Sequence, residues 1–134
     1  MKFYLAGRFI RSGEINECAD ELRGIGHTVS CRWLLGNHQI HPGSSEVDAS
    51  GDNVPMIARP FAQDDIEDVE KADALVLFTE RPYSDKGRGG RHVEFGYALG
   101  KGKEVYIIGP RENVFHTLPG VKQYASFDRF LKSL

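Results

Sequence analysis

The stretch that decides the fold runs from Ala74 to Lys103 and reads ALVLFTERPYSDKGRGGRHVEFGYALGKGK. Its first residues, 74–79, form a continuous apolar run, which is typical of a strand buried on both faces of a parallel sheet. A polar, glycine-rich loop follows at 80–90, and the residues from His92 to Lys101 have the pattern of a helix. In α/β proteins ligands bind outside the carboxyl ends of the strands, so we expect a site where this loop meets the helix.

Segments of two kinds alternate along the rest of the chain. Strand patterns lie at 3–6, 27–33, 73–79, 104–108 and 121–124, and helix patterns lie at 12–23, 62–72, 92–101 and 127–134. Such alternation predicts an α/β fold with a parallel sheet and right-handed crossovers. The length of 134 residues predicts a single domain, 1–134.

Residues 35–60 have the periodicity of neither element and are rich in glycine, proline and serine. A loop of this length inside a compact domain is typical of an active-site lid, a binding loop or a flexible insertion. The residues of this segment support two interpretations equally: a lid with a function at the site, and a flexible insertion without one.

The composition indicates a cytoplasmic protein that binds a small molecule. Its net charge of −2 provides no bulk attraction to nucleic acid or to an anionic membrane, so neither is expected as a partner. No apolar stretch approaches the roughly 20 residues of a membrane span. The opening MKFYLAG leads into a strand pattern rather than a signal peptide. Cys18 and Cys31 are expected to be buried free thiols in a reducing compartment.

Several motifs that would indicate other chemistries are missing from the sequence. It has no GxxxxGK[ST] for a P-loop, no GxSxG for a hydrolase elbow, and no CxxC or HExxH for zinc. The GRGG turn does not match GxGxxG, which makes a dinucleotide site a weak hypothesis. We therefore expect neither a metal nor an organic cofactor.

Glu94, near the start of the helix pattern, is the candidate catalytic carboxylate. The helix dipole and nearby arginines are expected to hold it ionised. A sheltered carboxylate can attack an anomeric carbon while a second carboxylic acid protonates the leaving group, as in retaining glycosidases. From the residues alone, Glu94 is explained equally well as an acidic side chain that only stabilises the start of the helix.

The glycines of the turn leave room for a ligand to approach backbone N–H groups. A phosphate could lie at Gly89 and Gly90, with Arg88 or Arg91 as its charged partner. A flexible turn with solvated arginines fits these residues equally well.

Four parts of the chain resemble the nucleoside 2-deoxyribosyltransferase superfamily, which includes the 2′-deoxynucleoside 5′-monophosphate N-hydrolases. They are the opening YLAG at 4–7, the segment 65–73 before the buried strand, VEFGYAL at 93–99 with Lys103 after it, and Asn113. The resemblance spans almost the whole chain, and its helix motif is the most specific part. It implies a flavodoxin-like or Rossmann-like three-layer α/β fold with a four- to five-stranded parallel sheet.

The resemblance also implies roles for individual residues. Glu94 falls on the family's nucleophile, Asp65 on its catalytic acid, and Tyr4 on the tyrosine close to the nucleophile and sugar. Gly7, Arg8 and Phe9 fall on the turn that walls the sugar and, in the nucleotide hydrolases, touches phosphate. Asn113 falls near a residue lent to a neighbouring subunit's site, which implies a homodimer or larger homo-oligomer.

One departure from the family concerns Arg88. Six residues before the glutamate, the transferases have an aspartate and the nucleotide hydrolases a serine, whereas this chain has an arginine. A cation there fits a phosphate, with Arg91 and His92 competing for the same role. The residue therefore favours a nucleoside 5′-monophosphate as substrate.

The predicted function is cleavage of the N-glycosidic bond of a (deoxy)nucleoside or its 5′-monophosphate, by hydrolysis or by transfer to another base, as in nucleotide salvage. Two alternatives stay open. One is a nucleotide-sensing module of the same fold without catalysis. The other is a phosphoribohydrolase of the lysine-decarboxylase-like type, whose GGxGTxxE motif is partly matched by residues 89–94.

Overall fold

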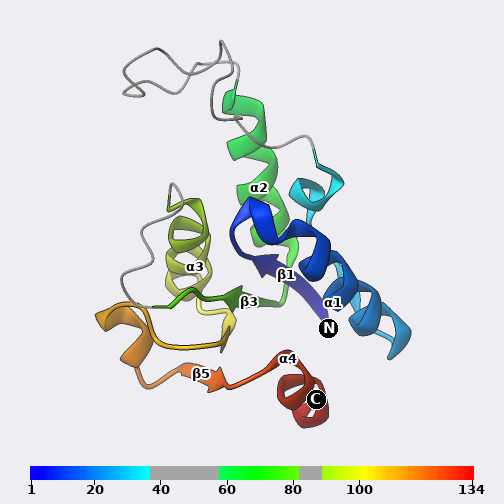
Figure 1. The fold of residues 1–134 in the computed structure, drawn as a ribbon. Helices are drawn as coiled ribbons and strands as arrows, with labels where there is room; N and C mark the ends of the chain where they lie inside the picture. Colours follow the sequence, from blue (N-terminus) through cyan, green and yellow to red (C-terminus); the bar gives the residue numbers. More distant parts are fainter. Residues whose placement is uncertain (37–57, 82–88) are drawn as a thin grey trace.

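The protein forms one parallel sheet with helices on both faces (Figure 1). The structure, a computed structural model, describes residues 1–36, 58–81 and 89–134. The strands are β1 (Lys2–Ala6), β2 (Thr28–Val29), β3 (Ala74–Phe78), β4 (Glu104–Ile108) and β5 (Val121–Tyr124), in the order β2-β1-β3-β4-β5, and every neighbouring pair is parallel. This is the flavodoxin-like strand order, which confirms the predicted fold class.

Within the described ranges, four α-helices cover the sheet: α1 (Ser12–Gly24), α2 (Arg59–Lys71), α3 (Gly90–Gly100) and α4 (Phe127–Ser133). Right-handed crossovers place α2 and α3 on one face, where they pack against each other and against β1. The neighbouring residues Phe3 and Tyr4 point to opposite faces. Phe3 packs edge-on against Phe130 of α4, whereas Tyr4 contacts Glu94 of α3.

Strand β3, at the centre of the sheet, and its neighbour β1 are almost completely buried. In β3 all five residues are buried, and in β1 only Lys2 is partly exposed. Burial on both faces explains why these strands are continuous apolar runs rather than alternating ones. They give the sheet a rigid centre, from which the carboxyl-end loops project.

The predicted strand at 27–33 is wrong beyond Val29. The chain instead enters a short 3-10 helix, η2 (Arg32–Leu35). The backbone N–H of Leu5 donates to Cys31 Sγ at 3.0 Å, and the backbone N–H of Arg32 donates to Asp68 of α2 at 2.8 Å. Side chains thus take the hydrogen bonds that a longer β2 would have made.

Two further expectations concern the loop and the membrane. Most of the predicted loop at 35–60 lies outside the described residues, over positions 37–57. Among the helices that the structure describes, none is long and apolar enough to cross a membrane.

Replacing Gly109 with alanine is expected to destabilise the fold. This glycine follows β4 with φ +115°, and an added Cβ would lie 2.5 Å from Thr79 Oγ1. Strain and overpacking should lower the free energy of unfolding by about 1–3 kcal/mol, measured by urea denaturation. Gly96→Ala is the matched control, because a Cβ there meets nothing within 4 Å inside helix α3. It should raise stability by up to about 1 kcal/mol. Equal effects of the two changes would contradict this account.

Candidate active site

The candidate site lies where the carboxyl ends of β1 and β3 meet. These neighbouring strands lead into connections on opposite faces of the sheet, β1 into α1 and β3 into α3. Such a switch point opens a crevice at the carboxyl edge, where ligands bind in open α/β sheets. Residues 7–9 follow β1 at this edge, and residues 79–81 follow β3.

A hydrogen bond between Tyr4 and Glu94 lies at the centre of the site. Tyr4 is fully buried in β1, and its hydroxyl donates to Glu94 Oε2 on α3. Glu94 is only partly buried. The strand therefore fixes one carboxylate oxygen of a side chain that is itself only partly buried.

Asp65 of α2 is close enough for its charge to act on both residues. The pKa of Tyr4 is raised by burial, by the charge of Glu94 and, to a smaller extent, by the charge of Asp65. The charge of Asp65 also adds to the effect of burial in raising the pKa of Glu94. The structure therefore brings together the three residues predicted to be catalytic, one each from β1, α2 and α3. Their individual roles stay predictions.

The protonation state of Glu94 differs from the sequence-based expectation. Burial, joined by the charge of Asp65 and opposed by the Tyr4 hydrogen bond, raises the pKa of Glu94 to about 8. Helix α3 begins at Gly90, so Glu94 lies in its second turn, beyond the reach of most of the dipole effect. Arg91 forms an ion pair with Glu112. Burial of Glu94 therefore opposes the ionisation expected from the sequence, and Arg88, one of the arginines expected to favour it, lies outside the described residues.

Arg32 anchors the part of α2 that carries Asp65. Its guanidinium binds Asp64 Oδ1 at 3.1 Å and Asp68 Oδ1 at 3.1 Å, and these two aspartates are one turn apart on α2. Asp68 is 3% exposed and also accepts from Ser30, so this anchor is firm. Asp65 is one residue beyond Asp64, about 100° further around the helix. Fixing Asp64 and Asp68 thereby fixes the rotation of α2 about its axis, and with it the place from which the charge of Asp65 acts on Tyr4 and Glu94.

The three predicted wall residues follow β1 at the carboxyl edge of the sheet. Gly7 packs so tightly that a Cβ there would lie 2.5 Å from Ile15 Cδ1. The Arg8 guanidinium forms an ion pair with Glu80 after β3, with 3.9 Å between Nη1 and Oε1. The ring of Phe9 lies 6.4 Å from that of Trp33, between centroids.

The glycine turn before α3 is described from Gly89 onward. Gly89 precedes the helix with φ +85°, and Gly90 is its first residue. Arg88, the residue expected at a phosphate, lies outside the described residues together with Gly87. Its predicted role is therefore still a prediction.

Arg91 and its neighbours form a buried polar cluster at the start of α3. Arg91 is 8% exposed, and its Nη2 lies 2.6 Å from Glu112 Oε1. The rings of His92 and His116 lie 5.8 Å apart beside this pair. Burial lowers the pKa of both histidines, which favours their neutral forms. Arg91 Nε is buried and makes no hydrogen bond within the described part of the chain, so the pair with Glu112 leaves the guanidinium incompletely satisfied.

Asn113 is exposed and caps the short 3-10 helix η4 (Val114–Thr117) by accepting from the N–H of Phe115. Two apolar side chains beside it, Val114 and Phe115, are 74% and 61% exposed. Large apolar side chains grouped on a surface are typical of protein contacts. Asn113 therefore lies on a face suited to the predicted subunit contact.

Four charged residues that surround the site were missed by the sequence reasoning: Arg11, Arg32, Glu80 and Glu112. One signal was available, since Arg32 and Glu80 each follow a strand at the carboxyl edge of the sheet. Their partners come from distant parts of the chain, which a local pattern does not reveal.

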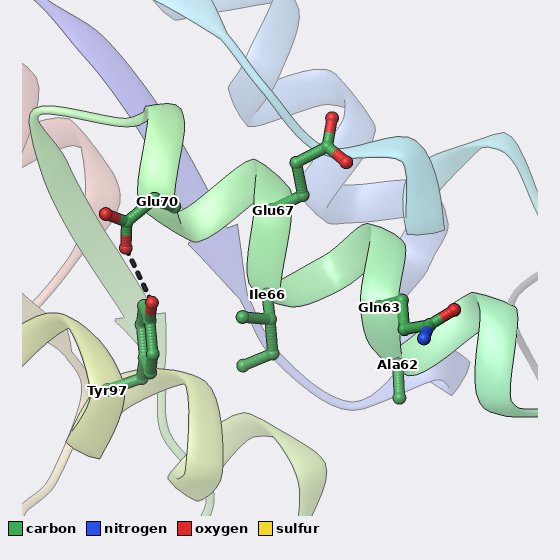
Figure 2. A pocket seen from close by; sticks show the side chains of 6 residues that line it. All are labelled: Ala62, Gln63, Ile66, Glu67, Glu70 and Tyr97. Carbon is green, nitrogen blue, oxygen red and sulfur yellow. Dashed lines mark hydrogen bonds between the residues drawn. The ribbon is translucent and has the colours of Figure 1, made fainter.

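A separate open groove of about 450 Å³ lies between α2 and α3 (Figure 2). Ala62, Ile66 and Tyr97 supply apolar surface, and the Tyr97 hydroxyl donates to Glu70 Oε2 at 2.6 Å. Tyr4, Asp65 and Glu94 do not line it. The groove is therefore distinct from the candidate active site.

The described residues include no group of three or more His, Cys, Asp or Glu side chains that could hold a metal ion.

Two solved structures share this fold. The CMP N-glycosidase of Clostridium botulinum aligns over 99% of this chain and 97% of its own, with a TM-score of 0.58 and 17% sequence identity. A 2-desoxiribosyltransferase from Leishmania mexicana aligns over 80% of this chain and 63% of its own, with a TM-score of 0.56 and 16% identity. The resemblance inferred from the sequence is thus confirmed for the fold. By sequence, no protein-family model and no curated protein matches the chain.

The raised pKa of Glu94 predicts a pH dependence of stability. Its pKa is about 8 in the folded protein against an ordinary 4.5, so the native state binds more protons than the unfolded state between these values. Glu94 should therefore lower the free energy of unfolding as pH rises from about 4.5 to 8, by at most about 1.4 kcal/mol per pH unit. Urea denaturation of wild type and Glu94→Gln at pH 5, 6, 7 and 8 measures this difference.

The advantage of Glu94→Gln over wild type should grow with pH and level off above about 8. Stability curves that stay parallel across this range would show that Glu94 has an ordinary pKa.

Proposed function

We propose that this protein cleaves the N-glycosidic bond of a (deoxy)nucleoside or its 5′-monophosphate through a glycosyl ester on Glu94. The observation that carries the proposal is the Tyr4–Glu94 hydrogen bond at the crevice, with the Asp65 charge acting on both residues. Two carboxyl groups of this kind suit displacement at an anomeric carbon. The fold shared with a CMP N-glycosidase and a 2-desoxiribosyltransferase supports the same reaction class.

In the first step a carboxylate oxygen of Glu94 attacks C1′ of the sugar. The C1′–N bond breaks, its electron pair goes to the base nitrogen, and Asp65 as a carboxylic acid protonates the departing base. The products are the free base and a glycosyl ester on Glu94, with Asp65 left as a carboxylate.

In the second step water or another base attacks C1′, and the ester bond to Glu94 breaks. The Asp65 carboxylate takes the proton of the attacking molecule, which restores the acid. Attack by water gives hydrolysis, and attack by a base gives transfer.

For this reaction the carboxyl groups of Glu94 and Asp65 must share a single proton, so that one is a carboxylic acid and the other a carboxylate. In the free protein the raised pKa of Glu94 keeps that proton on Glu94 at neutral pH. For the reaction to begin, the proton must be on Asp65 and Glu94 must be ionised. The Tyr4 hydroxyl favours this arrangement, because its hydrogen bond lowers the pKa of Glu94 against the effect of burial.

No metal or organic cofactor enters this scheme, because protonation activates the leaving base. Asp65, Tyr4 and Glu94 supply the acid, the positioning donor and the nucleophile.

Substitution of the three residues should separate their roles. Wild type, Glu94→Gln, Asp65→Asn and Tyr4→Phe are incubated with matched nucleosides and 5′-monophosphates, in ribose and deoxyribose forms, and free base is followed by chromatography. Glu94→Gln should lose at least about 10³-fold in rate and Asp65→Asn about 10²–10⁴-fold. Tyr4→Phe should lose less, because it removes one hydrogen bond to the nucleophile.

Base release by Glu94→Gln at the wild-type rate would refute the mechanism. Calorimetry on the same samples tests the sensing alternative, which requires binding without base release. Base release from ribonucleotides that Asp65→Asn leaves unchanged would favour the phosphoribohydrolase alternative, because its motif is matched at residues 89–94 and does not include Asp65.

We also propose that the protein works as a homodimer or larger homo-oligomer in which Asn113 completes a neighbouring subunit's site. The support is the position of Asn113 on an exposed apolar face with Val114 and Phe115.

Subunit complementation tests this assembly directly. Asn113→Ala and Glu94→Gln are each expected to have low activity alone. After the two are mixed and allowed to exchange subunits, a hybrid contains one site with both Glu94 and Asn113, so activity should recover. Light scattering after gel filtration gives the oligomeric state. A monomer, or no recovery after proven exchange, would contradict the proposal.

A further inference from the structure

His116 closes the turn that carries Asn113. Its backbone N–H donates to the carbonyl of Asn113 at 3.1 Å, and its ring Nδ1 accepts from the backbone N–H of Glu112 at 3.0 Å. These two hydrogen bonds involve the residue on the amino side of Asn113 and the backbone of Asn113 itself. One histidine therefore holds the backbone on both sides of the Asn113 side chain.

The ring of His116 also attaches this turn to helix α3. It is 1% exposed, although it lies in a short helix whose other side chains are mostly exposed. The ring of Phe95 lies edge-on to it at 5.0 Å, and the ring of His92 lies at 5.8 Å, between centroids. Phe95 is the residue after Glu94, so the turn packs on the helix that carries the candidate nucleophile.

A histidine is a costly choice for this buried position. Its Nε2 is buried and has no hydrogen-bond partner within the described part of the chain. A phenylalanine would fill similar space beside Phe95 without an unpaired polar atom. What the imidazole adds is the Nδ1 acceptor for the N–H of Glu112, which would otherwise be left without this partner.

The hydrogen bond from Glu112 requires a neutral ring. Nδ1 accepts only when it carries no proton, so the proton of neutral His116 is on Nε2. A second proton would put an N–H on Nδ1, directly against the backbone N–H of Glu112. Protonation of the ring and closure of the turn therefore exclude each other.

The charged groups around the ring oppose its protonation. Among the described residues they are Arg91 and His92 on α3, and Arg111 and Glu112 before the turn. Burial contributes most to lowering the pKa of His116, and the charges of His92, Arg91 and Arg111 add to it against that of Glu112. The carboxylate of Glu112 is paired with Arg91. The neutral ring is thus the form that the folded protein favours.

Building on the proposed function, we infer that neutral His116 is a positioning residue that holds Asn113 in place for the neighbouring subunit's site, and that protonation of its ring releases the turn. His116 acts through the backbone of the turn and does not take part in the chemistry. Asn113 is held in this way only while Nδ1 remains an acceptor.

Two substitutions separate the acceptor from the ring. An asparagine can place Oδ1 near the position of Nδ1, so His116→Asn keeps an acceptor for Glu112 but takes up no proton. His116→Phe keeps a ring and loses the acceptor. At pH 8, His116→Asn should keep kcat/KM for base release within about threefold of wild type, whereas His116→Phe should lose at least about tenfold.

The pH profile is the measurement that a merely structural role would not change. As pH falls from about 8 to about 5, wild type should lose more activity than His116→Asn, because only the wild-type turn contains a ring that takes up a proton. The ratio of kcat/KM for His116→Asn to that for wild type should therefore rise on acidification. A ratio independent of pH, or a folded His116→Phe with wild-type activity, would overturn the inference.

His27→Asn is the matched control. His27 lies before β2, at the opposite edge of the sheet from the site, and its Nδ1 lies 3.1 Å from the terminal ammonium nitrogen of Met1. This variant should keep the wild-type pH profile. Thermal melting shows whether each variant is folded.

Nuclear magnetic resonance tests the turn without any catalysis. In isotope-labelled wild type at pH 8, the ring of His116 should carry its proton on Nε2, and the amide resonances of Glu112 and Asn113 should shift as the ring takes up a second proton. If no substrate releases base, the proposed function fails, but this measurement still decides whether the turn is held by the neutral ring. A proton on Nδ1 at pH 8, or amides that do not respond to the ring, would overturn the inference.

Discussion

The hydrogen bond from the Tyr4 hydroxyl to Glu94 joins the centre of the sheet to the helix layer that covers it. Tyr4 is fully buried in a strand that is itself buried on both faces, so the hydroxyl has a fixed position. That position determines where one oxygen of Glu94 lies. The nucleophile of the proposed reaction is thus held by the most rigid part of the fold, although it comes from a helix that follows a loop.

A second constraint anchors the helix that carries the acid. Helix α2 carries Asp64, Asp65, Glu67 and Asp68 within little more than one turn. Arg32 binds three of these carboxylates, Asp64, Glu67 and Asp68, and pins that side of the helix to the chain after β2. The charge of Asp65, on the same stretch of α2, acts on Tyr4 and Glu94. An acidic helix that resembles a simple solvated surface therefore combines carboxylates held by one arginine with a carboxylate whose charge acts at the site.

The sequence was sufficient for features set by local pattern. The apolar runs of β1, β3 and β4 predict buried parallel strands, and the glycines at 89–90 mark the start of α3 within two residues. It was insufficient where distant side chains decide. Residues Cys31 and Arg32 were predicted to continue the strand, but Cys31 Sγ accepts from the backbone N–H of Leu5 and the backbone N–H of Arg32 donates to Asp68 instead. The protonation of Glu94 depends on Asp65, which is far away in the chain, and the ion pairs of Arg8 and Arg11 with Glu80 exist only once β1 and β3 are neighbours.

The central claim is that Glu94 forms a covalent bond to the sugar. It is tested most directly with a nucleoside or nucleoside monophosphate that carries fluorine at C2′, which slows breakdown of a glycosyl ester more than its formation when the first leaving group is good. Mass spectrometry of the digested protein should then find the fluorosugar attached to the peptide that contains Glu94, with about one equivalent of base released. Base release with no adduct on the protein, or with an adduct on a residue other than Glu94, would contradict the account.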